Sequence, residues 1–207
     1  MSNANKIFKE YNLLELGLLP TDWDKQIIEL ANSNSYLVHL DGNSSTSREP
    51  VGSKGADVFV VDGEAICEKI NWLDKLYKNE LLEFANRDFK NEYCISNSVT
   101  NGININFLKG RNSRYEWHVD SNPLTGILYV TAHNKGKGGE LIFKVGDDEQ
   151  VVYPQTGIFI LFDAREIPHT VQPLQTDTFR ISIPMNFYFK DAEQVRPSDL
   201  DNYIYKK

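Results

Sequence analysis

The sequence predicts a mainly β protein, built as an antiparallel sandwich or barrel and preceded by a largely helical segment. From Tyr93 to Phe189 the chain consists of short β-type runs separated by turn residues. Before about residue 90, apolar residues recur instead at spacings of three and four, which is typical of amphipathic helices. At 207 residues the chain is long enough to bury one sizeable core. Many short strands at this spacing favour a sandwich or a barrel.

The N-terminal part is expected to contain two main helices. Apolar residues crowd Leu13–Leu19 up to Pro20, and Thr21 then offers an N-cap for a helix with an apolar stripe. A second amphipathic helix is predicted over Ala65–Phe84, whose apolar residues lie on one face.

Two strands are predicted between these helices, over Tyr36–Leu40 and Asp57–Val61. They flank a Gly- and Ser-rich segment, residues 41–55, which contains Arg48 and Lys54. This segment is long for a plain connection, so two interpretations stay open: a loop over a site, or a surface excursion.

Nine further strands are expected in the C-terminal part, separated by glycine and proline breakers. They are Tyr93–Val99, Ile103–Lys109, Tyr115–Val119, Gly126–Thr131, Glu140–Lys144, Gln150–Tyr153, Gly157–Phe162, His169–Val171 and Thr178–Phe189. The tail after Lys190 is expected to be a helical or irregular extension.

Composition argues against several partners and locations. The formal charge of −7 and the pI near 5.1 disfavour nucleic acid and polybasic membrane contacts, which need clustered positive charge. The longest apolar run, Ile158–Phe162, is too short to span a bilayer, and the N-terminus lacks the apolar core of a secretory signal. Cys67 and Cys94 are too few for a disulfide framework. We therefore expect a cytoplasmic protein.

A candidate metal site begins at His118 and Asp120. On an extended strand, residues two apart point to the same face, so these side chains can present one nitrogen and one oxygen to a single ion. His169 can supply a third ligand. Two histidines and one carboxylate leave three positions open, which suits iron(II) that must also bind a cosubstrate and O2. The alternative is a half-buried histidine and a turn aspartate leading into Asn122-Pro123.

Arg180 is the second unusual residue, because it lies in an otherwise apolar β run. A buried guanidinium needs an anionic partner, and its two-pronged geometry suits the far end of a dicarboxylate. Ser182 shares its face of the strand.

Together these segments closely resemble the prolyl-hydroxylase branch of the 2-oxoglutarate/Fe(II) oxygenases, over about residues 100–189. The segments are Tyr115–Asp120 (YEWHVD), Gly138–Leu141 (GGEL), Phe162 with Pro168–Pro173 (PHTVQP), and Arg180–Ser182 (RIS). The resemblance implies a double-stranded β-helix (jelly-roll) core with flanking helices. It assigns His118, Asp120 and His169 to iron, and Arg180 with Ser182 to the C5 carboxylate of 2-oxoglutarate.

The resemblance further implies Fe(II), 2-oxoglutarate and O2 as cofactor and cosubstrates, with ascorbate as a reductant. Asp120, which halogenating relatives replace with a small residue, implies hydroxylation. The substrate is then a prolyl residue, or a free amino acid or small natural product. One oxygenase domain is expected, with a mostly helical support (1–91), a catalytic core (92–190) and a C-terminal extension (191–207).

One departure from the family concerns the cosubstrate pocket. The family usually places a tyrosine nine or ten residues before the first metal histidine, and no tyrosine lies in that region here. Asn106, Tyr115 or Tyr129 can replace it, and the sequence leaves all three open. His39 and His133 lack ligand spacing and are interpreted as surface or hydrogen-bonded histidines.

Three rival functions fit the sequence less well. A non-catalytic jelly-roll binding module has no reason to keep three ligands and the arginine. A cupin-type metalloenzyme typically shows His-x-His, which this sequence lacks. Nucleic-acid demethylation conflicts with the acidic balance of the chain.

Overall fold

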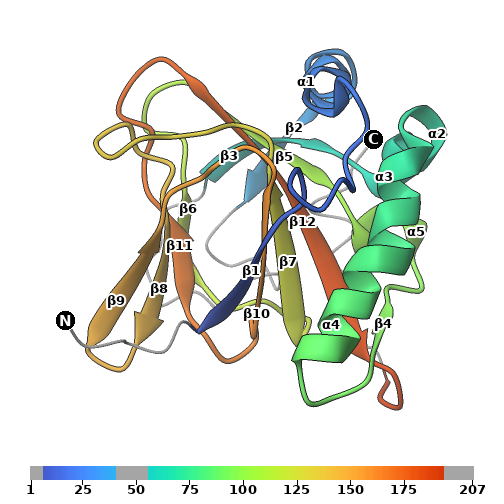
Figure 1. The fold of residues 1–207 in the computed structure, drawn as a ribbon. Helices are drawn as coiled ribbons and strands as arrows, with labels where there is room; N and C mark the ends of the chain where they lie inside the picture. The colour runs from blue at the N-terminus through green and yellow to red at the C-terminus, as the bar shows by residue number, and fades with distance from the viewer. Residues whose placement is uncertain (1–6, 41–55, 194–207) are drawn as a thin grey trace.

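The computed structural model describes residues 7–40 and 56–193, which form two antiparallel sheets with helices on one side (Figure 1). The major sheet has the order β1-β10-β7-β12-β5-β3-β2, with β4 paired to β12, and the minor sheet has the order β6-β11-β8-β9. The major strands are β1 (Phe8–Asn12), β2 (Tyr36–Leu40), β3 (Ala56–Val61), β4 (Tyr93–Ile95), β5 (Ile105–Lys109), β7 (Leu124–Tyr129), β10 (Ile158–Phe162) and β12 (Phe179–Phe189). The minor strands are β6 (Tyr115–His118), β8 (Leu141–Val145), β9 (Asp148–Val152) and β11 (His169–Val171).

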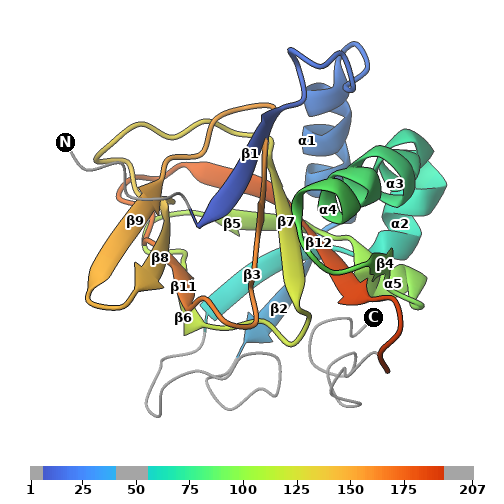
Figure 2. The same ribbon diagram turned by 60° about the horizontal axis from the view of Figure 1, so that its bottom comes forward.

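The two sheets face each other across an apolar core (Figure 2). Alternate residues of the major strands, such as Ile127, Tyr129 and Ile160, meet Leu141 and Phe143 of the minor sheet. This is the period-two alternation expected of sheets that bury one face against each other. The predicted mainly β, antiparallel fold is confirmed.

The helices cover the opposite face of the major sheet. They are α1 (Trp23–Asn34), α2 (Gly63–Lys69), α3 (Asn71–Leu76), the π-helical turn η1 (Tyr77–Leu81), α4 (Leu82–Asp88) and α5 (Val99–Gly102). Their apolar stripes pack on residues such as Phe107, Ile181 and Ile183, which point away from the inter-sheet core. Among the described residues, no helix is both long and apolar enough to cross a bilayer.

Several predicted boundaries differ from the structure. Helix α1 begins one residue later than Thr21 predicts, after Asp22, whose backbone is left-handed at φ 57°. The leucine-rich segment 13–19 forms turns instead of a helix, with Gly17 at φ +67°. The single helix predicted over Ala65–Phe84 is interrupted at Ile70, where φ and ψ are −134° and 54°.

Two strand assignments also need correction. The run predicted over Tyr93–Val99 ends at Ile95, because the chain turns there into α5. That turn packs so closely on α2 that a Cβ at Gly63 would lie 1.9 Å from the Val99 carbonyl oxygen. Strand β1 was not predicted, because an edge strand with exposed Lys9 and Glu10 lacks an apolar alternation.

The N-terminal part is not only helical, since β1, β2 and β3 join the major sheet. The predicted division into support, core and extension therefore stays a prediction. Arg48 and Lys54 of the proposed loop, and most of the C-terminal extension, lie outside the described residues.

Candidate active site

Three side chains converge at one edge of the inter-sheet space. His118 ends β6 and His169 begins β11, and the two residues are direct antiparallel partners. Asp120 follows β6, and its Oδ1 lies 3.6 Å from His118 Nε2 and 3.7 Å from His169 Nε2. All three potential ligand atoms lie within 4.8 Å of one another, which suits a single ion. The structure thus brings together the predicted cluster.

Both imidazoles are oriented by backbone carbonyl groups. His118 Nδ1 donates to the Glu116 carbonyl oxygen at 2.7 Å, and His169 Nδ1 donates to the Ile167 carbonyl oxygen at 3.0 Å. A carbonyl can only accept, so each neutral ring keeps its lone pair on Nε2, which faces Asp120. Burial and the neighbouring His118 lower the pKa of His169 to about 4, so its ring is neutral near neutral pH.

The carboxylate of Asp120 is held by two residues that the sequence analysis did not single out. Its Oδ2 accepts a hydrogen bond of 2.5 Å from the Thr125 hydroxyl on β7, and Asn122 Nδ2 donates to that same hydroxyl at 2.8 Å. Asn122 was interpreted only as part of a turn. No signal in the sequence marks Thr125, because its partner is set by the packing of β7 against the segment after β6.

Arg180 lies at the other end of the inter-sheet space and is 1% exposed. Its Nε donates to the Gly139 carbonyl oxygen at 2.9 Å, and its Nη1 donates to Ser182 Oγ at 2.7 Å. Its Nη2 has no hydrogen-bond partner among the described residues. Burial lowers the pKa of this guanidinium, but its ordinary value is high enough to keep it charged.

The Gly138–Gly139 segment is shaped by its approach to Arg180 and β12. Both residues have positive φ, +78° and +83°, which side chains rarely adopt. A Cβ at Gly138 would lie 2.0 Å from the Pro173 carbonyl oxygen, and one at Gly139 would lie 3.1 Å from Arg180 Cδ. A side chain at Gly138 would clash with the backbone, and one at Gly139, whose carbonyl oxygen accepts from Arg180, would be crowded and strained.

Tyr129 and Asn106 lie beside Arg180 on the same inner face. Both are cross-strand partners of Ser182, one on β7 and the other on β5. The Arg180 guanidinium lies 5.4 Å from the centroid of the Tyr129 ring, and the Tyr129 hydroxyl has no hydrogen-bond partner among the described residues. Burial raises the pKa of this hydroxyl, so it remains a donor. Two donors that lack a partner within the described part of the chain therefore meet here, and they suit an anionic acceptor.

The position that departs from the family pattern is occupied by Leu108. It is fully buried in the inter-sheet core and is the cross-strand partner of Arg180. Tyr115, the third alternative, lies on β6 of the opposite sheet with its ring centroid 6.0 Å from that of His118. Of the three alternatives, Tyr129 is the one with an unpaired polar atom next to Arg180.

Strand β7 connects the two ends of the site. Thr125, Ile127 and Tyr129 share its inner face, with Thr125 bonded to Asp120 and Tyr129 stacked by Arg180. Four residues of strand span about 13 Å, a distance that a five-carbon diacid covers with the side chains at each end. The rings of Phe162 and Phe143 lie 4.9 Å and 6.3 Å from that of His169, so this wall is apolar.

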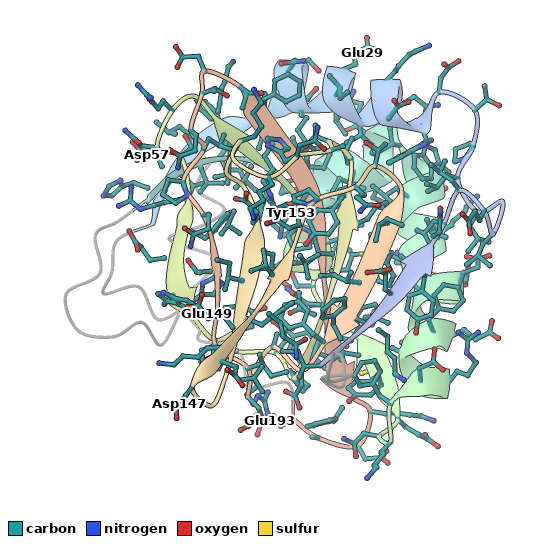
Figure 3. All side chains as sticks on the ribbon, turned by 60° about the vertical axis from the view of Figure 1, so that its left-hand side comes forward. Glu29, Asp57, Asp147, Glu149, Tyr153 and Glu193 are labelled. Carbon is teal, nitrogen blue, oxygen red and sulfur yellow. The ribbon has the colours of Figure 1, made fainter. Side chains whose placement is uncertain are left out.

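The remaining histidines lie away from the cluster. His39 pairs with Asp57 at 2.7 Å on the exposed β2–β3 hairpin, where Figure 3 labels Asp57 at the surface. His133 is buried behind Arg180, and its Nε2 lies 3.0 Å from the Phe179 carbonyl oxygen. Their interpretation as surface and hydrogen-bonded histidines agrees with these positions.

Many solved structures share this fold, and three of them are representative. A 2OG-Fe(II) oxygenase family oxidoreductase from Burkholderia pseudomallei is 14% identical, with a TM-score of 0.64 and coverage of 95% of this chain and 89% of its own. A prolyl hydroxylase of Trichoplax adhaerens, in complex with a hypoxia inducible factor peptide fragment, is 19% identical, with a TM-score of 0.63. The match covers 90% of this chain and 85% of the hydroxylase chain. HygX from Streptomyces hygroscopicus, with nickel and 2-oxoglutarate bound, is 8% identical, with a TM-score of 0.65 and coverage of 93% and 87%. These likenesses confirm the jelly-roll fold.

Sequence comparison gives a separate result. No curated protein matches the chain by sequence. Residues 103–188, however, match the family model of the 2OG-Fe(II) oxygenase superfamily, whose members use iron(II), 2-oxoglutarate and O2. The predicted resemblance and enzyme class are thereby confirmed. The matched segment contains the three clustered side chains and Arg180.

Proposed function

We propose that this protein is a hydroxylase in which His118, Asp120 and His169 hold iron(II). The observation that carries the proposal is that this cluster lines the same inter-sheet space as Arg180 Nη2 and the Tyr129 hydroxyl, two donors that have no hydrogen-bond partner among the described residues. The donor set fits the metal, because two imidazoles and one carboxylate leave three positions for other ligands. The unpaired donors fit the cosubstrate, because a carboxylate accepts from both.

The proposed chemistry divides between the bound groups and the protein. When bound, iron(II) with 2-oxoglutarate and O2 supplies the oxidation that yields a hydroxylated substrate, succinate and CO2. Arg180, Ser182 and Tyr129 would grip the far carboxylate of the cosubstrate and fix its orientation. The aromatic wall beside His169 would exclude water from the reacting groups. Asp120 keeps the position that halogenating relatives leave open, which favours hydroxylation.

The substrate proposed first is a prolyl residue in a peptide. This choice rests on the family resemblance and on the fold shared with a prolyl hydroxylase that binds a peptide fragment. A free amino acid or small natural product is the alternative, since HygX and other structures of this fold are not prolyl hydroxylases by name. Ascorbate as a reductant and a cytoplasmic location remain predictions.

The first experiment tests the metal and the cosubstrate together. Anaerobic protein with Fe(II) and 2-oxoglutarate should give a weak visible metal-to-ligand band that neither component gives alone. Absence of the band at saturating concentrations would count against the proposal and in favour of a non-catalytic binding module.

The second experiment addresses the substrate. Succinate release, measured with and without ascorbate, would be screened over proline-containing peptides and free amino acids. Stimulation by peptides alone supports the prolyl assignment. If only free amino acids stimulate succinate release, the small-molecule alternative replaces the prolyl assignment.

A further inference from the structure

We propose that Thr125 and Asn122 are positioning residues that leave only Oδ1 of Asp120 available to the metal. The inference deepens the proposed function and rests on it, because it concerns how one ligand is aimed. The hydrogen bonds of these two residues reach Asp120 and the Leu124 carbonyl oxygen. Their contribution would be to decide which carboxylate oxygen binds and how many coordination positions remain.

The direction of the hydrogen-bond chain follows from its fixed end. Asn122 Nδ2 lies 2.7 Å from the Leu124 carbonyl oxygen, and a carbonyl can only accept. The amide nitrogen of Asn122 must therefore face this group, and the same nitrogen also donates to the Thr125 hydroxyl at 2.8 Å. The hydroxyl, already accepting from Asn122, gives its own proton to Asp120 Oδ2 at 2.5 Å.

Burial makes this series of hydrogen bonds rigid. Asn122 and Thr125 are 3% and 2% exposed, so water does not compete for their hydrogen bonds. The backbone around Asp120 is held as well. Its amide donates to the Ala164 carbonyl oxygen at 2.8 Å, and Arg165 Nη2 donates to the Ser121 carbonyl oxygen at 2.7 Å. The carboxylate therefore has little freedom to rotate about its side chain.

The consequence concerns the number of open coordination positions. Oδ2 is committed to Thr125, while Oδ1 faces His118 Nε2 and His169 Nε2 at 3.6 Å and 3.7 Å. A carboxylate that binds through one oxygen takes one position of an octahedral ion. If both oxygens bound, the protein would occupy four positions and leave two. The hydroxyl of Thr125 thus protects the third open position.

The test measures Mn(II) affinity instead of turnover. Mn(II) accepts the same nitrogen and oxygen ligands in octahedral coordination and is stable in air, and its free ion can be counted by electron paramagnetic resonance. Thr125→Val removes the hydroxyl at nearly constant volume, and we expect it to weaken Mn(II) binding by about 10- to 100-fold, as the loss of an outer-shell partner usually does. Thr125→Ser keeps the hydroxyl and should restore affinity to within about threefold of the unmodified protein.

Asn122→Asp reverses the direction of these hydrogen bonds and keeps the size of the side chain at residue 122. The new carboxylate would accept the Thr125 proton and leave Asp120 Oδ2 without a donor. We expect a loss of Mn(II) affinity comparable to that of Thr125→Val. Thr170→Val is the matched control, because Thr170 is equally buried but donates to the Tyr115 carbonyl oxygen at 2.7 Å.

The outcomes separate this inference from the proposed function. If the unmodified protein binds no Mn(II), the proposed metal centre is wrong. If it binds Mn(II) and Thr125→Val binds equally well, the metal centre stands and the positioning inference fails. Equal losses in Thr125→Val and Thr170→Val would also overturn it, since they would indicate a general effect of removing a buried hydroxyl. Thermal unfolding of each metal-free variant identifies any that do not fold, and Thr125→Ser then carries the comparison with Asn122→Asp.

Discussion

The two ends of the inter-sheet space differ in how their polar atoms are satisfied. At the cluster of His118, Asp120 and His169, each ring Nδ1 and the second carboxylate oxygen is already bonded within the protein. At the other end, Arg180 Nη2 and the Tyr129 hydroxyl are buried and have no hydrogen-bond partner in residues 7–40 and 56–193. At the first end, the protein alone orients the side chains that can bind the metal. At the second end, the hydrogen bonds of the two donors are completed only when an acceptor binds.

This difference has an energetic consequence. A buried donor without a partner costs about 1–3 kcal/mol, and more when it is charged. The ligand-free protein therefore bears a cost near Arg180 that an incoming carboxylate would offset. Among the described residues, no side-chain atom of the metal end is buried without a hydrogen-bond partner by the same criterion. Binding at the two ends should respond differently to substitution.

The largest effect is expected for His169→Ala at the metal end. Removing a ligand should weaken metal binding by more than about 100-fold, because the loss of an outer-shell partner alone costs about 10- to 100-fold. Iron-dependent succinate formation should fall to background. His169→Gln, which keeps more of the volume beside Phe162, controls for packing. Unchanged turnover in either variant would remove residue 169 from the metal.

The next effect is expected for Arg180→Ala at the other end. Loss of a buried partner for a charged ligand costs about 2–5 kcal/mol, so the 2-oxoglutarate requirement should rise by about 30-fold or more. Mn(II) affinity should stay near that of the unmodified protein, because Arg180 belongs to the other end. Arg180→Lys keeps the positive charge but loses the two-pronged guanidinium group, and should give an intermediate loss of 2-oxoglutarate affinity.

Arg111→Ala is the matched control for that experiment. Arg111 is exposed and donates to the Gln175 carbonyl oxygen, so its removal should leave the 2-oxoglutarate requirement unchanged. An unaltered requirement in Arg180→Ala would show that the far-carboxylate role is misplaced. A parallel loss of Mn(II) affinity would show that the two ends are not independent.

The main lines of the fold and metal cluster were predictable because they depend on local periodicity. His118 and Asp120 lie two apart next to a strand, and Arg180 interrupts an apolar run, so each stands out in a short window of sequence. His169 was a candidate for the third ligand, and the family resemblance then assigned it to the metal. Its distances to Asp120 agree with that placement.

The rest depended on which strands become neighbours. Thr125 is an ordinary strand residue until β7 packs beside the segment that follows β6. The choice among Asn106, Tyr115 and Tyr129 was open for the same reason, because cross-strand register decides which of them faces Arg180. Edge strand β1 and the interruption at Ile70 were missed, since neither follows from an apolar pattern.

The smallest expected effect is on 2-oxoglutarate binding, and it distinguishes Tyr129 from Asn106 and Tyr115. Tyr129→Phe should raise the 2-oxoglutarate dissociation constant by about 5- to 10-fold, the equivalent of one hydrogen bond of about 1–1.5 kcal/mol. It should also stabilise the ligand-free protein by up to about 1 kcal/mol, because it removes a buried hydroxyl that has no partner. The dissociation constant would be measured calorimetrically and the stability by chemical unfolding without cosubstrate.

Tyr115→Phe and Asn106→Ala should each leave the 2-oxoglutarate dissociation constant within about twofold. The combination of weaker cosubstrate binding and higher ligand-free stability is expected only where a buried donor waits for its acceptor. If Tyr129→Phe instead destabilises the ligand-free protein, its hydroxyl already has a partner. The contrast between a metal end that the protein completes and a cosubstrate end that it leaves open would then not hold at this residue.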